Sequence, residues 1–222
     1  MQEINRLKTE ELFLELDAAF EKSDIKRIAE HNSCKWNYSL TSTPLHENSL
    51  LLIGFNPGAA KHISYEKQNK LPEENFLLQD LGSFKRIVPF LKMFFTEETI
   101  NRIVQINFCF FRSTKQNEIS HHDKTLCEPV FLKLISLINP KQAISFSAAF
   151  RQHLLFHHEL FENKFNHEIA SNKGMINVSV GEITINSKKI PIGFLPHPNY
   201  PLIKSVREKA WNVVTEKLKT YE

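Results

Sequence analysis

Three short segments carry the side chains that are best suited to chemistry. Gly54–Gly58 and Pro196–Pro201 each follow an apolar run, and Asn107 interrupts a third such run. The first segment contains Asn56 and the last contains His197. An asparagine side chain offers both a hydrogen-bond donor and an acceptor, and a histidine can donate to an oxygen on which negative charge develops. Brought together, these side chains would bind a polar group, position a water molecule and stabilise a departing anion.

The apolar runs themselves predict buried strands. Continuous runs without polar alternation suit strands that are covered on both faces of a parallel sheet. The predicted strands are Ser49–Phe55, Ile103–Phe111, Ala143–Phe146 and Ile190–Leu195, the last preceded by β-branched sequence from 176 and by a hairpin turn near Asn186-Ser187.

Apolar residues at helical spacing predict helices between and around these strands. They cover 9–21, 24–31, 84–95, 124–138, 148–158 and 204–219. Strands that alternate with helices favour a parallel sheet, and ligands of such sheets bind beyond the carboxyl ends of the strands. We therefore expect the three polar segments to meet at one site. A long polar loop, 59–80, lies next to it in sequence and is of a length that is usually functional.

The bulk composition indicates one globular domain. The chain has 222 residues, of which 41% are hydrophobic, and its net charge of +3 permits a nucleic-acid partner without requiring one. We expect a single domain over 1–222, with 1–48 as a helical extension packed on it. The first residues lack the charged and apolar regions of a signal peptide, and no apolar run approaches the roughly 20 residues of a membrane span. We expect a cytoplasmic, monomeric protein with no membrane partner.

The polar segments resemble the motifs of the uracil-DNA glycosylase superfamily. Gly54–Gly58 is similar to its first motif, in the style of the mismatch-specific and single-strand-selective branches, and Pro196–Tyr200 is similar to its second. Ile106-Asn107 resembles the strand end whose asparagine reads the flipped base. The stretch 112–146 also follows the layout of the iron–sulfur-bearing branch, and the resemblance spans about residues 49–219. Three motifs in this order are far more specific than any one of them.

This resemblance implies a three-layer α/β/α fold around a central, mainly parallel, four-stranded sheet, and a DNA glycosylase that removes uracil or a related damaged base. Breaking the N-glycosidic bond leaves negative charge on the departing base. The implied catalytic residues are Asn56, which positions the water, and His197, which donates a hydrogen bond to the base. Asn107 would match the polar edge of the base.

The remaining residues of the implied site bind the base or the DNA. Gly54, Phe55 and a stacking aromatic would surround the base, with Phe76 as the first candidate for that aromatic and Tyr65 as the second. The residues expected to contact or enter the DNA are Pro57, Gly58, Pro198, Asn199, Tyr200, Pro201 and Lys204, with Arg207 as a further phosphate contact.

The chain departs from the family in two ways. Asn199 replaces the usual serine of the second motif, which puts one phosphate contact in doubt. Only three cysteines, Cys34, Cys109 and Cys127, are present, and three cannot supply the four thiolates of an iron–sulfur cluster. We expect no cofactor and no metal, and we interpret His153 and His157 as a solvated helix face.

Two other functions remain open at this stage. A member of the same fold that has lost catalysis would hold nucleic acid or a nucleotide without cleaving it. An unrelated α/β hydrolase is disfavoured, because the sequence has neither a Gly-x-Ser-x-Gly elbow nor a phosphate-binding loop. The sequence does not choose among uracil, thymine opposite guanine, xanthine and an oxidised pyrimidine.

Overall fold

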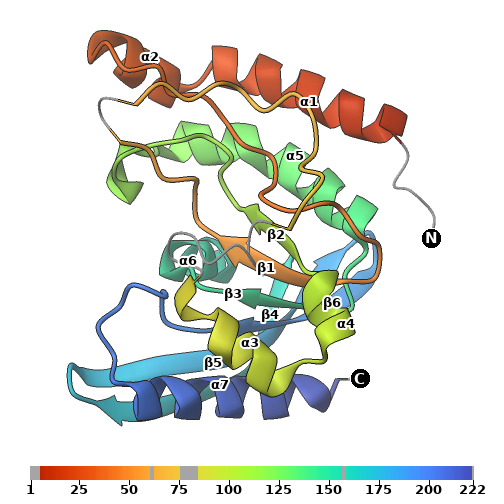
Figure 1. Cartoon of the computed structure of the whole chain (residues 1–222), viewed down its shortest axis with the longest axis vertical. Helices are drawn as coiled ribbons and strands as arrows, with labels where there is room; N and C mark the ends of the chain where they lie inside the picture. The colour runs from red at the N-terminus through yellow and green to blue at the C-terminus, as the bar shows by residue number, and fades with distance from the viewer. Residues whose placement is uncertain (1–5, 61–62, 76–84, 157–158, 222) are drawn as a thin grey trace.

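One sheet of six strands forms the centre of the molecule in the computed structural model, which describes residues 6–60, 63–75, 85–156 and 159–221 (Figure 1). The strands are β1 (Leu50–Gly54), β2 (Val104–Asn107), β3 (Gln142–Ser145), β4 (Phe161–Ser171), β5 (Gly174–Ile185) and β6 (Lys188–Phe194). Their order across the sheet is β2-β1-β3-β6-β5-β4. The predicted α/β class is confirmed, but the prediction of a four-stranded sheet is wrong, because the sheet has six strands.

The sheet has a parallel part and an antiparallel part. Strands β2, β1, β3 and β6 are parallel to one another, with Gly54 opposite Asn107 and Ser145 opposite Phe194. Strands β5 and β4 continue the sheet as an antiparallel hairpin beyond β6. Because the four parallel strands share one direction, their carboxyl ends lie along one edge of the sheet.

Strand β4 escaped prediction for a physical reason. Its apolar residues Phe161, Phe165 and Ile169 stand four apart, with polar residues between them, so the strand lacks the alternation that marks a half-buried strand. A bulge near Asn163 further disturbs its pairing with β5. The turn at Asn186-Ser187 was predicted correctly, since both residues adopt the positive φ angles, 49° and 64°, of a tight hairpin.

Helices cover both faces of the sheet. They are α1 (Arg6–Glu21), α2 (Asp24–His31), α3 (Val88–Phe94), α4 (Glu97–Asn101), α5 (His121–Ile138), α6 (Ala148–Phe156) and α7 (Lys204–Lys219). Helix α5 begins three residues before its predicted start, because Ser120 and Asp123 form a reciprocal capping box. Helix α4 was not predicted.

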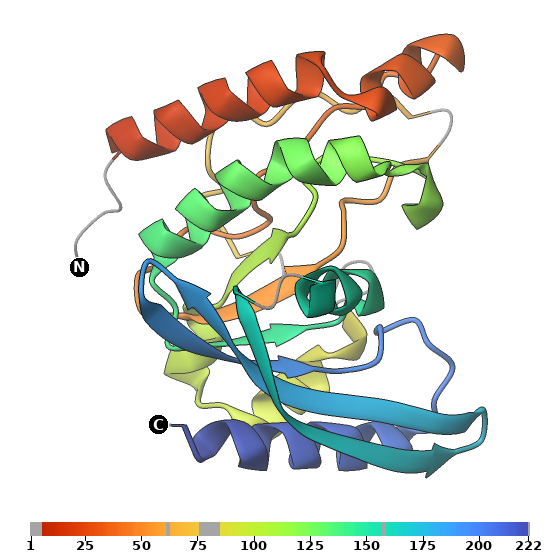
Figure 2. The same ribbon diagram turned by 180° about the vertical axis from the view of Figure 1, so that it is seen from behind.

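The two faces of β1 bury different helices, which explains its unbroken apolar sequence. Leu51 and Ile53 belong to a core formed with α1, α2, α5 and α6. Leu50 and Leu52 belong to a second core formed with α3, α4 and α7. Figure 2 shows the resulting arrangement, in which α1 and α2 lie outside α5, while α7 lies on the far side of the sheet beside β4 and β5.

The outer edge of the sheet is closed by the segment before β1. Tyr38 pairs with Phe111 and Thr41 pairs with Ile106, both in the antiparallel sense. This pairing satisfies the backbone of β2 at an edge that would otherwise be open to another chain. Within the described residues, no helix is long and apolar enough to cross a membrane.

Candidate active site at the carboxyl ends of the parallel strands

The segment after β1 runs beside the segment after β2. The backbone N–H of Phe108 donates to the carbonyl of Gly54 at 3.0 Å, and Cys109 N–H donates to Phe55 at 2.8 Å. Farther on, the N–H of Ala59 donates to the carbonyl of Ser113 at 2.9 Å. The loop that contains Asn56 is therefore held by backbone hydrogen bonds rather than by its own turn alone.

The side chain of Asn56 is oriented unambiguously. Its Nδ2 lies 3.1 Å from the carbonyl of Pro57, 3.3 Å from that of Phe111 and 2.8 Å from Ser113 Oγ. Carbonyl oxygens only accept, so the amide nitrogen must face them, and Ser113 Oγ uses its own hydrogen on the carbonyl of Lys115 at 2.8 Å. Asn56 Oδ1 has no hydrogen-bond donor among the described residues and is left to accept from a water molecule.

Asn107 lies directly beside Gly54. A Cβ atom built on Gly54 would stand 2.2 Å from Asn107 Oδ1, so only a glycine leaves room for this carboxamide. Asn107 is 8% exposed, and its side chain makes no hydrogen bond to any residue that the structure describes. Its carboxamide atoms are not among the fully enclosed, unpaired polar atoms of the described residues, so they can accept hydrogen bonds from a polar ligand and donate them to it.

His197 is held as a neutral imidazole. The backbone N–H of Asn199 donates to its Nδ1 at 3.1 Å, so the ring proton sits on Nε2. Desolvation of the ring's inner side, and then the positive charge of Arg207, lower the pKa of His197 below its ordinary value, although part of the residue is open to solvent. The free atom is therefore an N–H that can donate to an oxygen.

The His197 loop is fixed from three sides. Tyr200 N–H donates to the carbonyl of His197 at 2.9 Å, and Arg207 Nη2 donates to the carbonyl of Tyr200 at 2.7 Å. Asn172, in the turn of the β4–β5 hairpin, donates to the carbonyl of Pro201 at 3.4 Å. Hydrogen bonds from helix α7 and from the β4–β5 hairpin thus fix the position of the His197 loop.

The end of β3 connects the Asn56 loop and the His197 loop, a contribution that the sequence analysis missed. Ser145 Oγ donates to the carbonyl of Ile53 at 3.2 Å, and Leu195 N–H donates to the carbonyl of Ser145 at 2.9 Å. Neighbouring strands lie about 4.8 Å apart, so β1 and β6, with β3 between them, are about 10 Å apart. The two loops therefore follow strands that are separated by one strand, β3.

The structure describes two of the three aromatic residues that were expected to surround the base. Phe76 lies outside the described residues. Tyr65 is partly buried, its hydroxyl accepts from the N–H of Ala60 at 2.9 Å, and the guanidinium of Arg112 lies 4.7 Å from its ring centroid. One face of Tyr65 is therefore already occupied. Phe55 packs against the core on the α1 and α5 side, the opposite side of the sheet from Gly54 and Asn107.

The predicted DNA contacts fall into a buried and an exposed set. Pro57 and Pro198 are buried and stiffen the two loops. The exposed set is Gly58, Asn199, Tyr200, Pro201 and Lys204. The sequence analysis missed Ile203, which is 52% exposed beside Tyr200.

The cysteines and histidines form no metal site in the part of the chain that is described. Cys109 and Cys127 are buried free thiols with their sulfur atoms 3.5 Å apart, while Cys34 is partly exposed elsewhere. No three metal-ligating side chains of the described residues gather. The interpretation of His153 as part of a solvated helix face is wrong, because its side chain is 11% exposed and lies 3.4 Å from Glu128 Oε1 and 4.6 Å from the ring of Phe108. His157 is not among the described residues.

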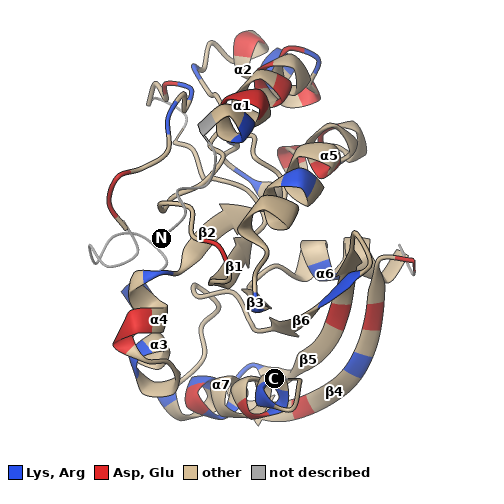
Figure 3. Cartoon of the chain, turned by 90° about the vertical axis from the view of Figure 1, so that its right-hand side faces the viewer, with Lys and Arg blue, Asp and Glu red and all other residues tan. Residues whose placement is uncertain are grey.

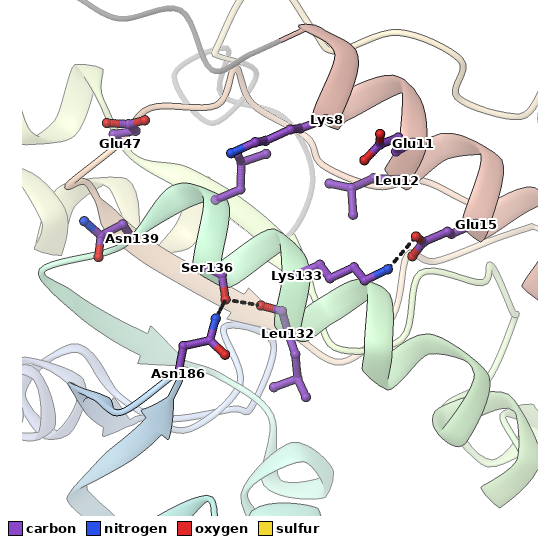
Figure 4. Close-up of a pocket in the computed structure, with 11 residues that line it drawn as sticks. Lys8, Glu11, Leu12, Glu15, Glu47, Leu132, Lys133, Ser136, Asn139 and Asn186 are labelled. Carbon is purple, nitrogen blue, oxygen red and sulfur yellow. Dashed lines mark hydrogen bonds and ion pairs between the residues drawn. The ribbon is translucent and has the colours of Figure 1, made fainter.

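A hollow of about 550 Å³ between α1 and α5 lies away from this site (Figure 4). Charged side chains line it, and Lys133 and Glu15 already pair with each other at 2.5 Å. It contains no carboxyl end of a parallel strand. We therefore place the candidate site at the strand ends, where Asn56, Asn107 and His197 stand at or just beyond the ends of β1, β2 and β6.

Comparison with known proteins adds no family: no protein-family model matches the chain, and a search of curated proteins gives no significant match.

Proposed function

We propose that this protein is a DNA glycosylase that hydrolyses the N-glycosidic bond of uracil or a related damaged base. The observation that carries the proposal is a set of three polar groups at the strand ends that form no hydrogen bond within the described part of the chain. Asn56 Oδ1 can accept, the carboxamide of Asn107 can donate and accept, and His197 Nε2–H can donate. These are the groups that water, a base edge and a departing base would need.

The proposed reaction breaks the bond between the sugar carbon C1′ and the base nitrogen. The bonding electrons leave with the base as an anion, and a water oxygen forms the new bond to C1′. The water gives up one proton to solvent as this bond forms, and the base anion takes up one proton from solvent, so the products are a sugar with a hydroxyl group at C1′ and a neutral base. Asn56 holds that water through Oδ1 but is too weak a base to remove its proton early. Departure of the base therefore leads the reaction, and stabilising the departing anion is the main task of the protein.

His197 fits that task as a neutral donor. Its Nε2–H would donate to a carbonyl oxygen of the base, and this hydrogen bond strengthens as negative charge builds there. Asn107 would recognise the polar edge of the same base from its place beside Gly54. Tyr200 and Ile203 are exposed apolar side chains next to His197, positioned to fill the space that a flipped nucleotide leaves.

The test is base release from an oligonucleotide with one labelled uracil, either single-stranded or opposite adenine or guanine. Alkali then cuts the strand at each abasic site. We expect cleavage by the native chain, and a fall of at least about a hundredfold in Asn56→Ala and in His197→Ala, since one electrostatic or acid–base group contributes about 10²–10⁴ in rate. His31→Ala, an exposed histidine at the end of α2 and outside the site, is the matched control and should keep full activity.

Two results would contradict the proposal. One is a folded native chain that cleaves no strand with uracil, hypoxanthine or xanthine, which would favour the alternative of a binding protein with the same fold. The other is cleavage that persists unchanged in both alanine variants.

A further inference from the structure

Two arginines lie near the starts of two helices that pack against each other. Arg207 is in the first turn of α7, one helical turn before Trp211, and Arg86 lies two residues before the first residue of α3. Phe90 of α3 stacks on Trp211 of α7 with a centroid distance of 5.9 Å and an angle of 10° between the rings. The contact between α3 and α7 therefore brings the chain at Arg86 to the same side of the sheet as Arg207.

Neither arginine has a counter-ion among the residues that the structure describes. Arg207 is 8% exposed, and its one hydrogen bond among the described residues goes to the carbonyl of Tyr200, which is neutral. No carboxylate of a described residue lies within ion-pair distance of Arg86 or Arg207. A cation that is nine-tenths buried is costly unless an anion or several hydrogen bonds compensate it.

The arginines also act on each other. Burial, and then the positive charge of Arg86, lower the pKa of Arg207. Arg207 in turn contributes to the lowered pKa of His197. Arg86, Arg207 and His197 are therefore close enough for the charge of each arginine to act on its neighbour, and neighbouring positive charges attract an anion.

We propose that Arg86 and Arg207 bind one backbone phosphate of a DNA strand next to the His197 loop. Arg86, which is exposed, makes the direct contact, and Arg207 holds the loop through Tyr200 while its charge faces the same phosphate. A phosphate here would sit beside the exposed Tyr200 and Ile203, where a strand must pass to present a base to His197. The inference rests on the proposed binding of DNA, though not on its cleavage.

Salt dependence of strand binding tests this site. The affinity of the native chain for an undamaged, labelled single strand is measured by fluorescence anisotropy over a range of salt concentrations. Each phosphate contact adds about 0.7 to the slope of log affinity against log salt for a single strand. Arg86→Gln should lower the slope by about that amount, whereas Lys209→Gln, an exposed lysine of α7 with the same change in charge, should leave it unaltered.

A second experiment distinguishes binding of a DNA strand from binding of free phosphate. Inorganic phosphate is titrated into the native chain at constant ionic strength while the side-chain signals of arginine are followed by NMR. Strand binding with the predicted loss of slope in Arg86→Gln supports the proposal even if no base is released. An unchanged slope in Arg86→Gln overturns it, and so does tight binding of inorganic phosphate without any effect of the variant on the strand. Base release with an unchanged slope would keep the glycosylase and reject this phosphate site.

Discussion

The candidate site depends on how single polar side chains are held rather than on which side chains are present. Asn56 is fixed by acceptors that only its amide nitrogen can meet, so its oxygen is the free atom. His197 is fixed by a backbone donor at Nδ1, so its other nitrogen carries the proton. In both cases the neighbouring backbone determines which polar atom of the side chain, a donor or an acceptor, remains available to a ligand.

Gly54 offers a steric test of Asn107. In Gly54→Ala the new methyl group would stand 2.2 Å from Asn107 Oδ1, and the end of that side chain must move away. The fold should survive, because only a side-chain tip is displaced. We expect base release at low substrate concentration to fall by about tenfold to a hundredfold, which corresponds to the loss of one or two hydrogen bonds to the base.

The control for Gly54→Ala is the same change in a chain that already carries Asn107→Ala. Without the Asn107 carboxamide, the nearest neighbour of the new Cβ atom is the backbone carbonyl oxygen of Ile106 at 3.9 Å, so Gly54→Ala should cause no further loss of base release there. An equal loss from Gly54→Ala in both chains would show that the methyl group does not act through Asn107.

The protonation of His197 predicts how activity depends on pH. Its pKa is lowered from the ordinary value of 6.5, so the neutral ring persists at neutral pH and somewhat below it. Protonation would place a second proton on Nδ1, against the N–H of Asn199, and would break that hydrogen bond. Activity should therefore be level around pH 7 and fall only at a pH below 6.5.

An NMR titration of His197 checks this directly. The pKa should lie below 6.5 in the native chain and should rise in Arg207→Gln, because the nearby positive charge is removed. A native pKa above 6.5, or a pKa that ignores the loss of Arg207, would contradict the electrostatic account.

At the scale of elements, the strands with an unbroken apolar sequence could be predicted well from the sequence. β1 and β3 were predicted because a strand buried on both faces needs an unbroken apolar run. Helix α7 was predicted over its observed bounds, since its apolar stripe and the proline-rich loop before it mark both its face and its start. β2 is shorter than predicted, because residues beyond Asn107 leave the sheet to run beside the Asn56 loop.

Other elements depend on contacts that a single sequence does not reveal. β4 pairs with β5 along almost its whole length. Because this pairing contributes to its stability, β4 does not need a strand pattern in its own sequence. The role of Ser113 in orienting Asn56 joins residues 57 positions apart, and nothing local in the sequence marks it. Likewise, the proximity of Arg86 to Arg207 becomes known only when α3 is placed against α7.

At the scale of the whole molecule, basic and acidic residues are mixed along the helices. Figure 3 shows Lys and Arg positions interspersed with Asp and Glu positions along α1, α2 and α7. Exposed ion pairs such as Lys26–Glu30 and Lys219–Glu216 account for many of them. Any affinity for nucleic acid should therefore come from a few placed cations at the strand ends, which is why a single arginine is expected to change the salt slope measurably.

The N-terminal helices are tied to the rest of the molecule by one buried carboxylate. Asp123 in α5 is 0% exposed, and its Oδ1 accepts from the N–H groups of Asp24 at 2.8 Å and Ile25 at 3.3 Å. Its Oδ2 accepts from the N–H of Ser120 at 2.9 Å. One side chain thus serves the first turns of both α2 and α5, where the helix dipoles also favour negative charge.

Asp123→Asn should therefore weaken the whole fold rather than one helix. The asparagine keeps one acceptor but turns the other into a donor that faces an N–H group, so the variant should lose about 1–3 kcal/mol of unfolding free energy. Urea denaturation measures this loss as a lower midpoint with an unchanged slope. Glu30→Gln, an exposed acidic residue of α2 with the same change in charge, should shift the midpoint very little. A native midpoint in Asp123→Asn would mean that apolar contacts between α1, α2 and α5 hold the N-terminal layer without this carboxylate.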